Sequence, residues 1–239
     1  MTTYGLYLES GPRRRKTMVH VLDLLGCVAV GPTTDDALAA TPDAIRAFLG
    51  TLRRQGEPVD PDAPFQTEVV EHITEGIWLG NGSPSIIFGP DLEPMTHEEL
   101  EVHIRRFQWM RETLADWAAT QTDADLDAAP AEGGRPGRAV LLHVLGATGG
   151  YLSIAFGGSR GFSAIQGAAE RGEISLPEAL RRSGALAIER LRAATPEELT
   201  TVRQRRSGPS TARQGIRRLL EHEWEHLAEL ARRPGGPQL

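Results

Sequence analysis

The chain has 239 residues, of which 40% are hydrophobic and 24% are charged, and its formal net charge is −6. This length can bury one large or two modest hydrophobic cores, and the composition is that of a globular protein. Nucleic-acid-binding domains normally present a basic face, so the acidic balance argues against that class. Two arginine-rich runs, residues 13–16 and 203–206, stand beside turn residues, and we interpret them as solvated loops.

Cysteine content and the amino-terminal segment bear on the compartment. Cys27 is the single cysteine, so no intrachain disulfide can form and a reducing compartment fits. The opening segment MTTYGLYLES lacks the basic-then-apolar layout of a signal peptide. We also expect no apolar run near the ~20 residues that span a bilayer. The sequence therefore predicts a cytoplasmic protein with neither a membrane nor a nucleic acid as partner.

Residues 1–80 read as a small α/β domain. Four β-prone runs predict strands, at residues 4–8, 17–22, 27–30 and 66–73. The run from Thr33 to Asp36 places hydroxyls and carboxylates where a helix amino terminus favours them. Pro42 is expected to interrupt that helix, and Thr41 to cap a second one.

From residue 96 onward the apolar spacing becomes helical. Four helices are predicted, beginning near Thr96, Arg138, Ser175 and Thr211. Thr96 and Glu99 form a capping-box pattern, and the helix over 138–156 is apolar nearly all round. Four such helices predict an antiparallel up-down bundle over residues 96–233. Residues 81–95, rich in Gly and Pro, are predicted to be a linker with a short strand at 85–88.

The last predicted helix carries two histidines, His222 and His226, four residues apart. This spacing places both on one side of a helix, one turn from each other, which suits chelation of a single ion. At 100° per residue the two histidines flank the apolar stripe and Glu223 falls within it. A carboxylate facing a core is costly unless a cation compensates it, so a nearby metal ion is one explanation. The alternative is a register that turns Glu223 to solvent.

His143 is the third expected metal ligand. It lies in the apolar helix over 138–156, where small neighbours such as Ala147 and Gly150 would admit a ligand or another helix. The alternative is a core histidine that bonds a backbone carbonyl. Three imidazoles from two helices would leave a fourth coordination position open, as in reactive zinc sites. They suit zinc, nickel, iron or copper about equally, and we expect zinc or nickel. His103 is a reserve ligand, whereas the remaining histidines are interpreted as structural or exposed: His20, His72 and His97.

The segment from His222 to His226 also matches H-E-x-x-H, in which the glutamate of zinc proteases activates water. Those enzymes take a third ligand from farther along the chain. Only thirteen residues follow His226; none is a histidine, and their one carboxylate, Glu229, lies on the same helix. A metalloprotease is therefore a minor alternative.

With these residues in view, residues 96–232 resemble the DinB-like superfamily. The resemblance rests on Leu142-His143-Val144 and on the segment from Leu219 to His226. It implies a four-helix bundle whose metal is held by one histidine of the second helix and an H-x-x-x-H pair of the last, commonly in a homodimer. Some similar proteins catalyse transfer or isomerisation that depends on low-molecular-weight thiols. Relatives often carry a carboxylate where this chain has Thr148-Gly149-Gly150, which leaves Glu223 as the candidate acid-base residue.

Residues 4–75 resemble the HicB-like antitoxin fold. The resemblance rests on the segment from Met18 to Cys27, on Gly31 to Leu38, and on Ala44-Ile45. It implies a three- or four-stranded antiparallel sheet packed on a helix. No DNA-binding ribbon or helix-turn-helix segment follows, so only the fold carries over.

Three functions follow from these patterns. The first is a metal-dependent enzyme, a thiol-dependent transferase or a hydrolase, in which Glu223 moves a proton. The second is a binding or regulatory protein whose HicB-like half recognises a partner or ligand while the helices form a homodimer. The third is the metalloprotease.

Overall fold

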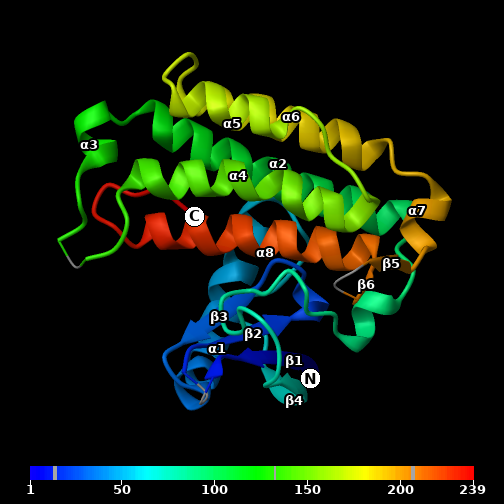
Figure 1. Ribbon diagram of the computed structural model, residues 1–239. Helices are drawn as coiled ribbons and strands as arrows, with labels where there is room; N and C mark the ends of the chain where they lie inside the picture. Colours follow the sequence, from blue (N-terminus) through cyan, green and yellow to red (C-terminus); the bar gives the residue numbers. More distant parts are fainter. Residues whose placement is uncertain (13–14, 132, 206–207) are drawn as a thin grey trace.

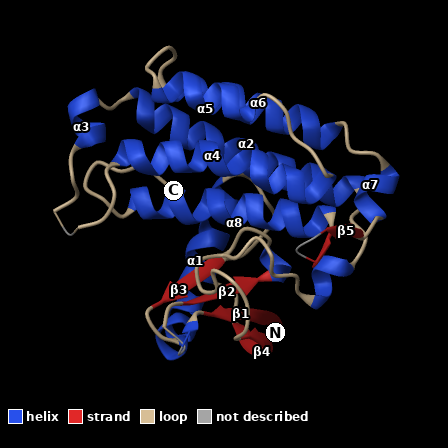
Figure 2. Ribbon diagram, in the orientation of Figure 1, coloured by secondary structure: helices blue, strands red, loops and turns tan. Residues whose placement is uncertain are grey.

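The computed structural model describes residues 1–12, 15–131, 133–205 and 208–239. Long helices form one layer and a small sheet lies below it, with helix α8 between the two (Figure 1). Colouring by secondary structure separates the helical layer from the sheet in the same view (Figure 2). This arrangement confirms the α+β class. Residues 13–14 and 206, which belong to the two arginine-rich runs, lie outside the described residues.

The sheet has four strands in the order β3-β2-β1-β4. Their bounds are Thr2–Ser10 (β1), Thr17–Val21 (β2), Val28–Gly31 (β3) and Phe65–Ile73 (β4). A short 3₁₀ helix, Leu22–Leu24, joins β2 to β3. Strands β1, β2 and β3 pair antiparallel, whereas β1 and β4 pair parallel. The expected all-antiparallel sheet is therefore wrong for one pair, because a helix connects β3 to β4 and returns the chain in the same direction.

That helix, α1 (Thr34–Arg54), is continuous across Pro42, so the expected interruption is wrong. The hydroxyl of Thr33 accepts a hydrogen bond from the backbone of Asp36 and caps the helix as predicted. Pro42 lies on the exposed side, where water can pair with the carbonyl that its missing N–H leaves free. Farther along the helix Ile45 and Phe48 are buried and hold it in place.

The bounds of the four long helices are His97–Ala119 (α2), Gly137–Phe156 (α4), Leu176–Arg192 (α6) and Ala212–Ala231 (α8). Three of the four begin directly after the predicted caps, and α4 begins one residue before Arg138, where its start was expected. Thr96 and Glu99 form the expected capping box, and Ser175 and Thr211 cap α6 and α8 through their hydroxyls.

Several short elements were not predicted. They are α3 (Asp123–Asp127), α5 (Phe162–Glu170), α7 (Pro196–Thr200), the hairpin of β5 (Arg203–Arg205) with β6 (Gly208–Ser210), and the 3₁₀ helix Gly89–Leu92. The strand expected at 85–88 does not form; these residues lie in turns and coil. The second arginine-rich run begins in β5, so the expectation of a loop is wrong for residues 203–205.

The long helices do not alternate strictly in direction. Ion pairs join Glu99 to Arg213 near the start of α2 and α8, and Arg111 to Glu223 farther along both, so these two helices are parallel. Helix α6 runs against α2, and α4 runs against α8, which makes α4 and α6 parallel as well (Figure 1). The arrangement differs from the expected up-down order because α5 packs against α4 and α6 and carries the chain back between them.

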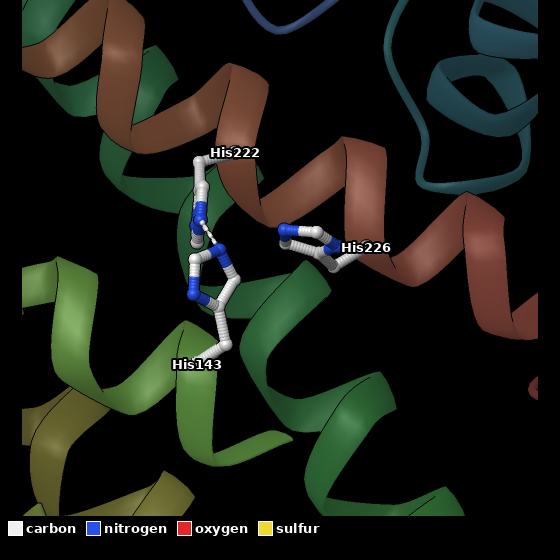
Figure 3. A group of neighbouring side chains, drawn as sticks. All are labelled: His143, His222 and His226. Atoms are coloured by element: carbon white, nitrogen blue, oxygen red, sulfur yellow. Dashed lines mark hydrogen bonds between the residues drawn. The ribbon is translucent and has the colours of Figure 1, made fainter. Parts of the chain in front are cut away.

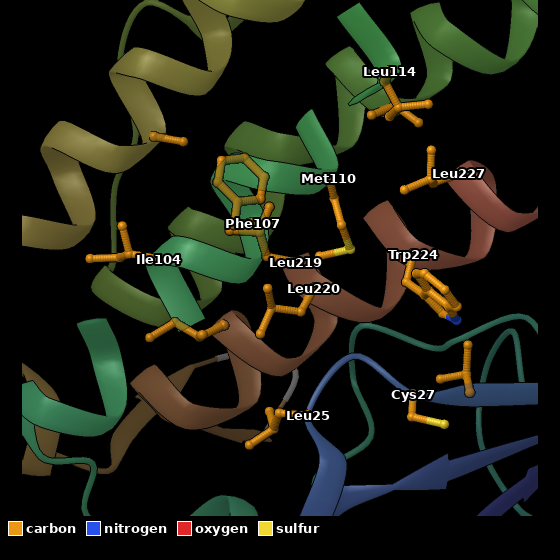
Figure 4. Close-up of a cluster of buried hydrophobic side chains, with 14 of the residues drawn as sticks. Leu25, Cys27, Ile104, Phe107, Met110, Leu114, Leu219, Leu220, Trp224 and Leu227 are labelled. Atoms are coloured by element: carbon orange, nitrogen blue, oxygen red, sulfur yellow. The ribbon is translucent and has the colours of Figure 1, made fainter. Parts of the chain in front are cut away.

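Helix α8 is buried on two sides, by the other helices and by the sheet. Figure 4 shows Met110 and Leu114 of α2 facing α8, while Cys27 lies on the sheet side near Trp224. The core is one continuous cluster from the sheet to the helices. The ring centroids of Phe48 in α1 and Trp224 in α8 are 4.9 Å apart. It crosses the boundary predicted at residues 81–95, and the division into domains stays a prediction. Burial raises the pKa of the Cys27 thiol, so this residue is an unreactive core side chain.

Helix α4 is long and apolar enough to cross a membrane, with a mean hydropathy of 1.6 over its most apolar window. The expectation of no such run is wrong, because the Gly, Ser and Thr residues that break the apolar run barely lower its mean hydropathy. Half of that window is buried inside the fold, as in the core helix of a soluble protein.

Candidate metal centre

Three histidines from two helices converge beside α8. His143 projects from α4, and His222 and His226 project toward it from successive turns of α8 (Figure 3). One nitrogen of each ring lies within 4.8 Å of the others, and the Nε2 atoms of His143 and His222 are 2.9 Å apart. Among the described residues, this group alone brings three potential ligands close enough for one ion.

The donor set fits one divalent transition metal. Two imidazole nitrogens bound to a tetrahedral ion at about 2.0–2.1 Å lie about 3.4 Å apart, and the observed separations bracket this value. Three nitrogens leave a fourth position free. His222 and His226 are 6% and 5% exposed, whereas His143 is exposed, so the cluster is closed on the α8 side and open toward solvent.

The surroundings favour the neutral form of two of the rings. Burial lowers the pKa of His222 well below its usual value, and the neighbouring His226 and Arg218 lower it further. For His143, burial is again the main cause, followed by His226 and Arg135. Neutral imidazole is the form that binds metal, so the lowered pKa values of His143 and His222 favour metal binding at neutral pH.

The carboxylate of Glu229 forms a hydrogen bond with His226. Glu229 lies one turn farther along α8, and its Oε2 accepts a hydrogen bond from Nδ1 of His226 at 2.8 Å. Burial alone would raise the pKa of Glu229, but His226, Arg135 and Arg233 lower it to about 2, so this carboxylate is charged. With Nδ1 protonated, the lone pair of His226 is on Nε2. Carboxylate–histidine pairs of this kind orient metal ligands and raise their basicity.

Replacing Glu229 with alanine is expected to weaken metal affinity about 10–100-fold, because the His226 ring loses its orientation and its fixed tautomer. Competition with a chelator of known affinity measures the change. Glu225→Ala, which removes a partly buried carboxylate from the same helix, is the matched control and should leave affinity within about twofold. Equal affinities for the two variants would contradict the role of Glu229.

Glu223, the expected acid-base residue, has another partner. Its two carboxylate oxygens accept hydrogen bonds from Nε and Nη2 of Arg111 at 2.6 and 2.8 Å, and both residues are 1% exposed. Nη2 of Arg111 also donates to the Thr148 hydroxyl at 2.9 Å. Glu223 thus lies inside the fold, as its place in the apolar stripe predicted. Its negative charge is compensated by Arg111 rather than by a metal ion. Its catalytic role stays a prediction, and this pairing does not favour it.

The other histidines lie outside the cluster. His103, the reserve ligand, is buried in α2, and burial followed by Arg106 lowers its pKa to about 3. The three histidines interpreted as structural or exposed make contacts elsewhere: His20 with Glu221, His72 with Ser10, and His97 with the carbonyl of Ala194.

Sequence reasoning missed several residues around the cluster. Arg111 follows Phe107 by four residues, which places an arginine on the core side of α2 and was a readable sign of a buried partner. Tyr151, two turns after His143, packs its ring 5.3 Å from that of His222. Arg135 comes from the loop before α4, and no sequence pattern pointed to it.

The fold and the cluster together define an α+β protein with a potential three-histidine metal site on its helical part. The family model of the DinB superfamily matches residues 106–230, just over half of the chain, and the chain belongs to this superfamily. No curated protein and no solved structure matches it. The match confirms the resemblance of the carboxy-terminal part, while the resemblance of residues 4–75 to the HicB-like fold stays a prediction.

Proposed function

We propose that this protein holds one divalent metal ion, zinc or nickel, through His143, His222 and His226 within a four-helix bundle. We further propose that it acts on a small-molecule thiol in a transfer reaction. The observation that carries the proposal is the convergence of three imidazoles on one point, open to solvent beside His143. Membership of the DinB superfamily supports it.

An ion at this site would supply Lewis-acid activation, which favours the thiolate form of a thiol near neutral pH. The chain itself contributes the three imidazole ligands, the Glu229 carboxylate that orients His226, and the buried wall of α8 that shields one side from water. A thiolate needs no general base to attack an electrophile. A metalloprotease of the H-E-x-x-H type uses its glutamate to activate water, whereas Glu223 is bound by Arg111. This contrast favours thiol transfer over the metalloprotease and over a hydrolase that uses Glu223 as its base.

Elemental analysis of the purified protein tests the metal site. We expect about one equivalent of metal in the wild type and loss of it in His143→Ala and His226→Ala. His97→Ala should retain the metal, because His97 lies outside the three-histidine cluster and bonds the carbonyl of Ala194. Wild-type protein that takes up no zinc or nickel would overturn the proposal.

Turnover separates the enzyme from the non-enzymatic alternative. The metal-loaded protein is assayed with a panel of low-molecular-weight thiols and electrophiles, and the thiol-dependent rate should disappear in His143→Ala. Stoichiometric metal without turnover on any pair would instead favour the binding or regulatory protein. Gel filtration of the same samples tests the expected homodimer.

A further inference from the structure

The rim of the three-histidine cluster carries an arginine that, among the residues the structure describes, shares its one carboxylate partner with a second arginine. Arg135, in the loop before α4, is 44% exposed, and its Nη2 lies 3.4 Å from Nδ1 of His226 and 3.3 Å from Oε2 of Glu229.

Within the described ranges, the hydrogen bonds around Arg135 leave its donors largely unused. Nδ1 of His226 carries a proton and donates a hydrogen bond to Glu229. That nitrogen therefore has no lone pair that could accept a hydrogen bond from Arg135. The remaining acceptor is Oε2 of Glu229, which His226 engages at 2.8 Å, while Arg233 bonds the other oxygen at 2.7 Å. The contact of Arg135 with this carboxylate is the longest of the three.

Charge is also unbalanced at this point. In the described parts of the chain, Arg135 and Arg233 pair with the single carboxylate of Glu229, which leaves one positive charge, and a divalent ion would raise the excess to three. This positive centre occurs in a chain of net charge −6. An anion bound there would be attracted both by the ion and by Arg135.

We propose that Arg135 and the open side of the three-histidine cluster form a two-point site for a small thiol that also carries a carboxylate. The thiol binds at the metal side and the guanidinium of Arg135 binds the carboxylate. This assignment rests on the proposed function and names the substrate class of that site. Arg135 is a specificity-determining residue here, and metal retention does not require it.

Two thiols that differ by one carboxylate test the proposal on the metal-loaded, full-length protein. We expect thioglycolate to bind roughly five- to tenfold more tightly than 2-mercaptoethanol in calorimetric titrations, because only thioglycolate gains the ion pair with Arg135. The preference should vanish in Arg135→Ala, while the affinity for 2-mercaptoethanol stays within about twofold. Arg232→Ala, which removes an exposed arginine at the end of α8, should keep the preference.

Metal affinity separates this role from a purely structural one. If Arg135 served to hold Glu229 in place, Arg135→Ala would weaken metal binding as Glu229→Ala does. The proposal predicts unchanged or tighter metal binding, since a positive charge is removed from beside the ion. Equal affinity of the wild type for both thiols, or a preference that survives Arg135→Ala, would overturn the proposal while leaving the metal site intact. Absence of metal in the same samples would overturn the proposed function and this inference together.

Discussion

Replacing Glu221 with alanine is expected to destabilise the fold by about 3–5 kcal/mol, because it leaves buried cations without their shared partner. Glu221 lies on α8 where the helix meets the sheet. It bonds His20 of β2 at 2.8 Å, and Arg217 and Arg218 of its own helix at 3.0 and 2.6 Å. All four residues are at most 1% exposed, so water cannot replace the lost carboxylate.

The same group makes stability depend on acid. Burial alone would raise the pKa of Glu221, but Arg217, His20 and Arg218 outweigh it and hold the pKa well below its usual value. A carboxyl whose pKa is lower in the folded state stabilises the fold at pH values above its unfolded pKa. That contribution is lost as the pH falls from about 4.5 toward the folded pKa.

Urea unfolding at pH 7 and pH 4, followed by tryptophan fluorescence, measures both effects. Glu221→Gln should lose most of the stabilisation that the Glu221 carboxylate contributes at pH 7. Its free energy of unfolding should also differ less between pH 7 and pH 4 than that of the wild type. Glu225→Ala, one turn along and less buried, should change the free energy of unfolding by no more than about 0.5 kcal/mol. A Glu221→Ala protein as stable as this control would contradict the role of the network.

Removing one member of the Arg111–Glu223 pair is expected to cost about 3–5 kcal/mol as well, because the other charge is left buried among the helices. Arg111→Met leaves the Glu223 carboxylate buried without its ion-pair partner, and Glu223→Ala does the same to the Arg111 guanidinium. The double variant Arg111→Met with Glu223→Leu should recover most of the loss, since apolar residues of similar volume replace both charges. Glu112→Ala, which removes the exposed neighbouring carboxylate, is the control.

The pair also decides between the two interpretations of Glu223. If this residue is structural, the double variant binds metal normally and retains thiol-dependent turnover. If it moves a proton in the reaction, turnover falls by orders of magnitude in a protein that is folded and metal-loaded. Chemical unfolding, metal content and turnover measured on the same preparations distinguish these outcomes.

Local signals predicted much of the helical part. The capping residues Thr96, Ser175 and Thr211 mark the observed starts of α2, α6 and α8, because each hydroxyl accepts a hydrogen bond from the first turn of its own helix. Such interactions involve residues three apart and are readable without the fold. The spacing of His222 and His226 is local in the same way. Pro42 misled because burial of α1 outweighs the hydrogen bond that proline removes.

The sequence by itself determined the helix starts, the place of Glu223 inside the apolar stripe, and two histidines on one side of α8. Only the tertiary structure decided that His143 faces them, that Glu223 pairs with Arg111, and that Arg135 lies at the rim. It also decided that α8 is covered by a sheet, which buries the charges around Glu221 that a helical pattern would leave in water. Periodicity within one helix fixes which side a residue is on. What covers that side depends on chain segments as much as 200 residues apart, such as His20 and Glu221.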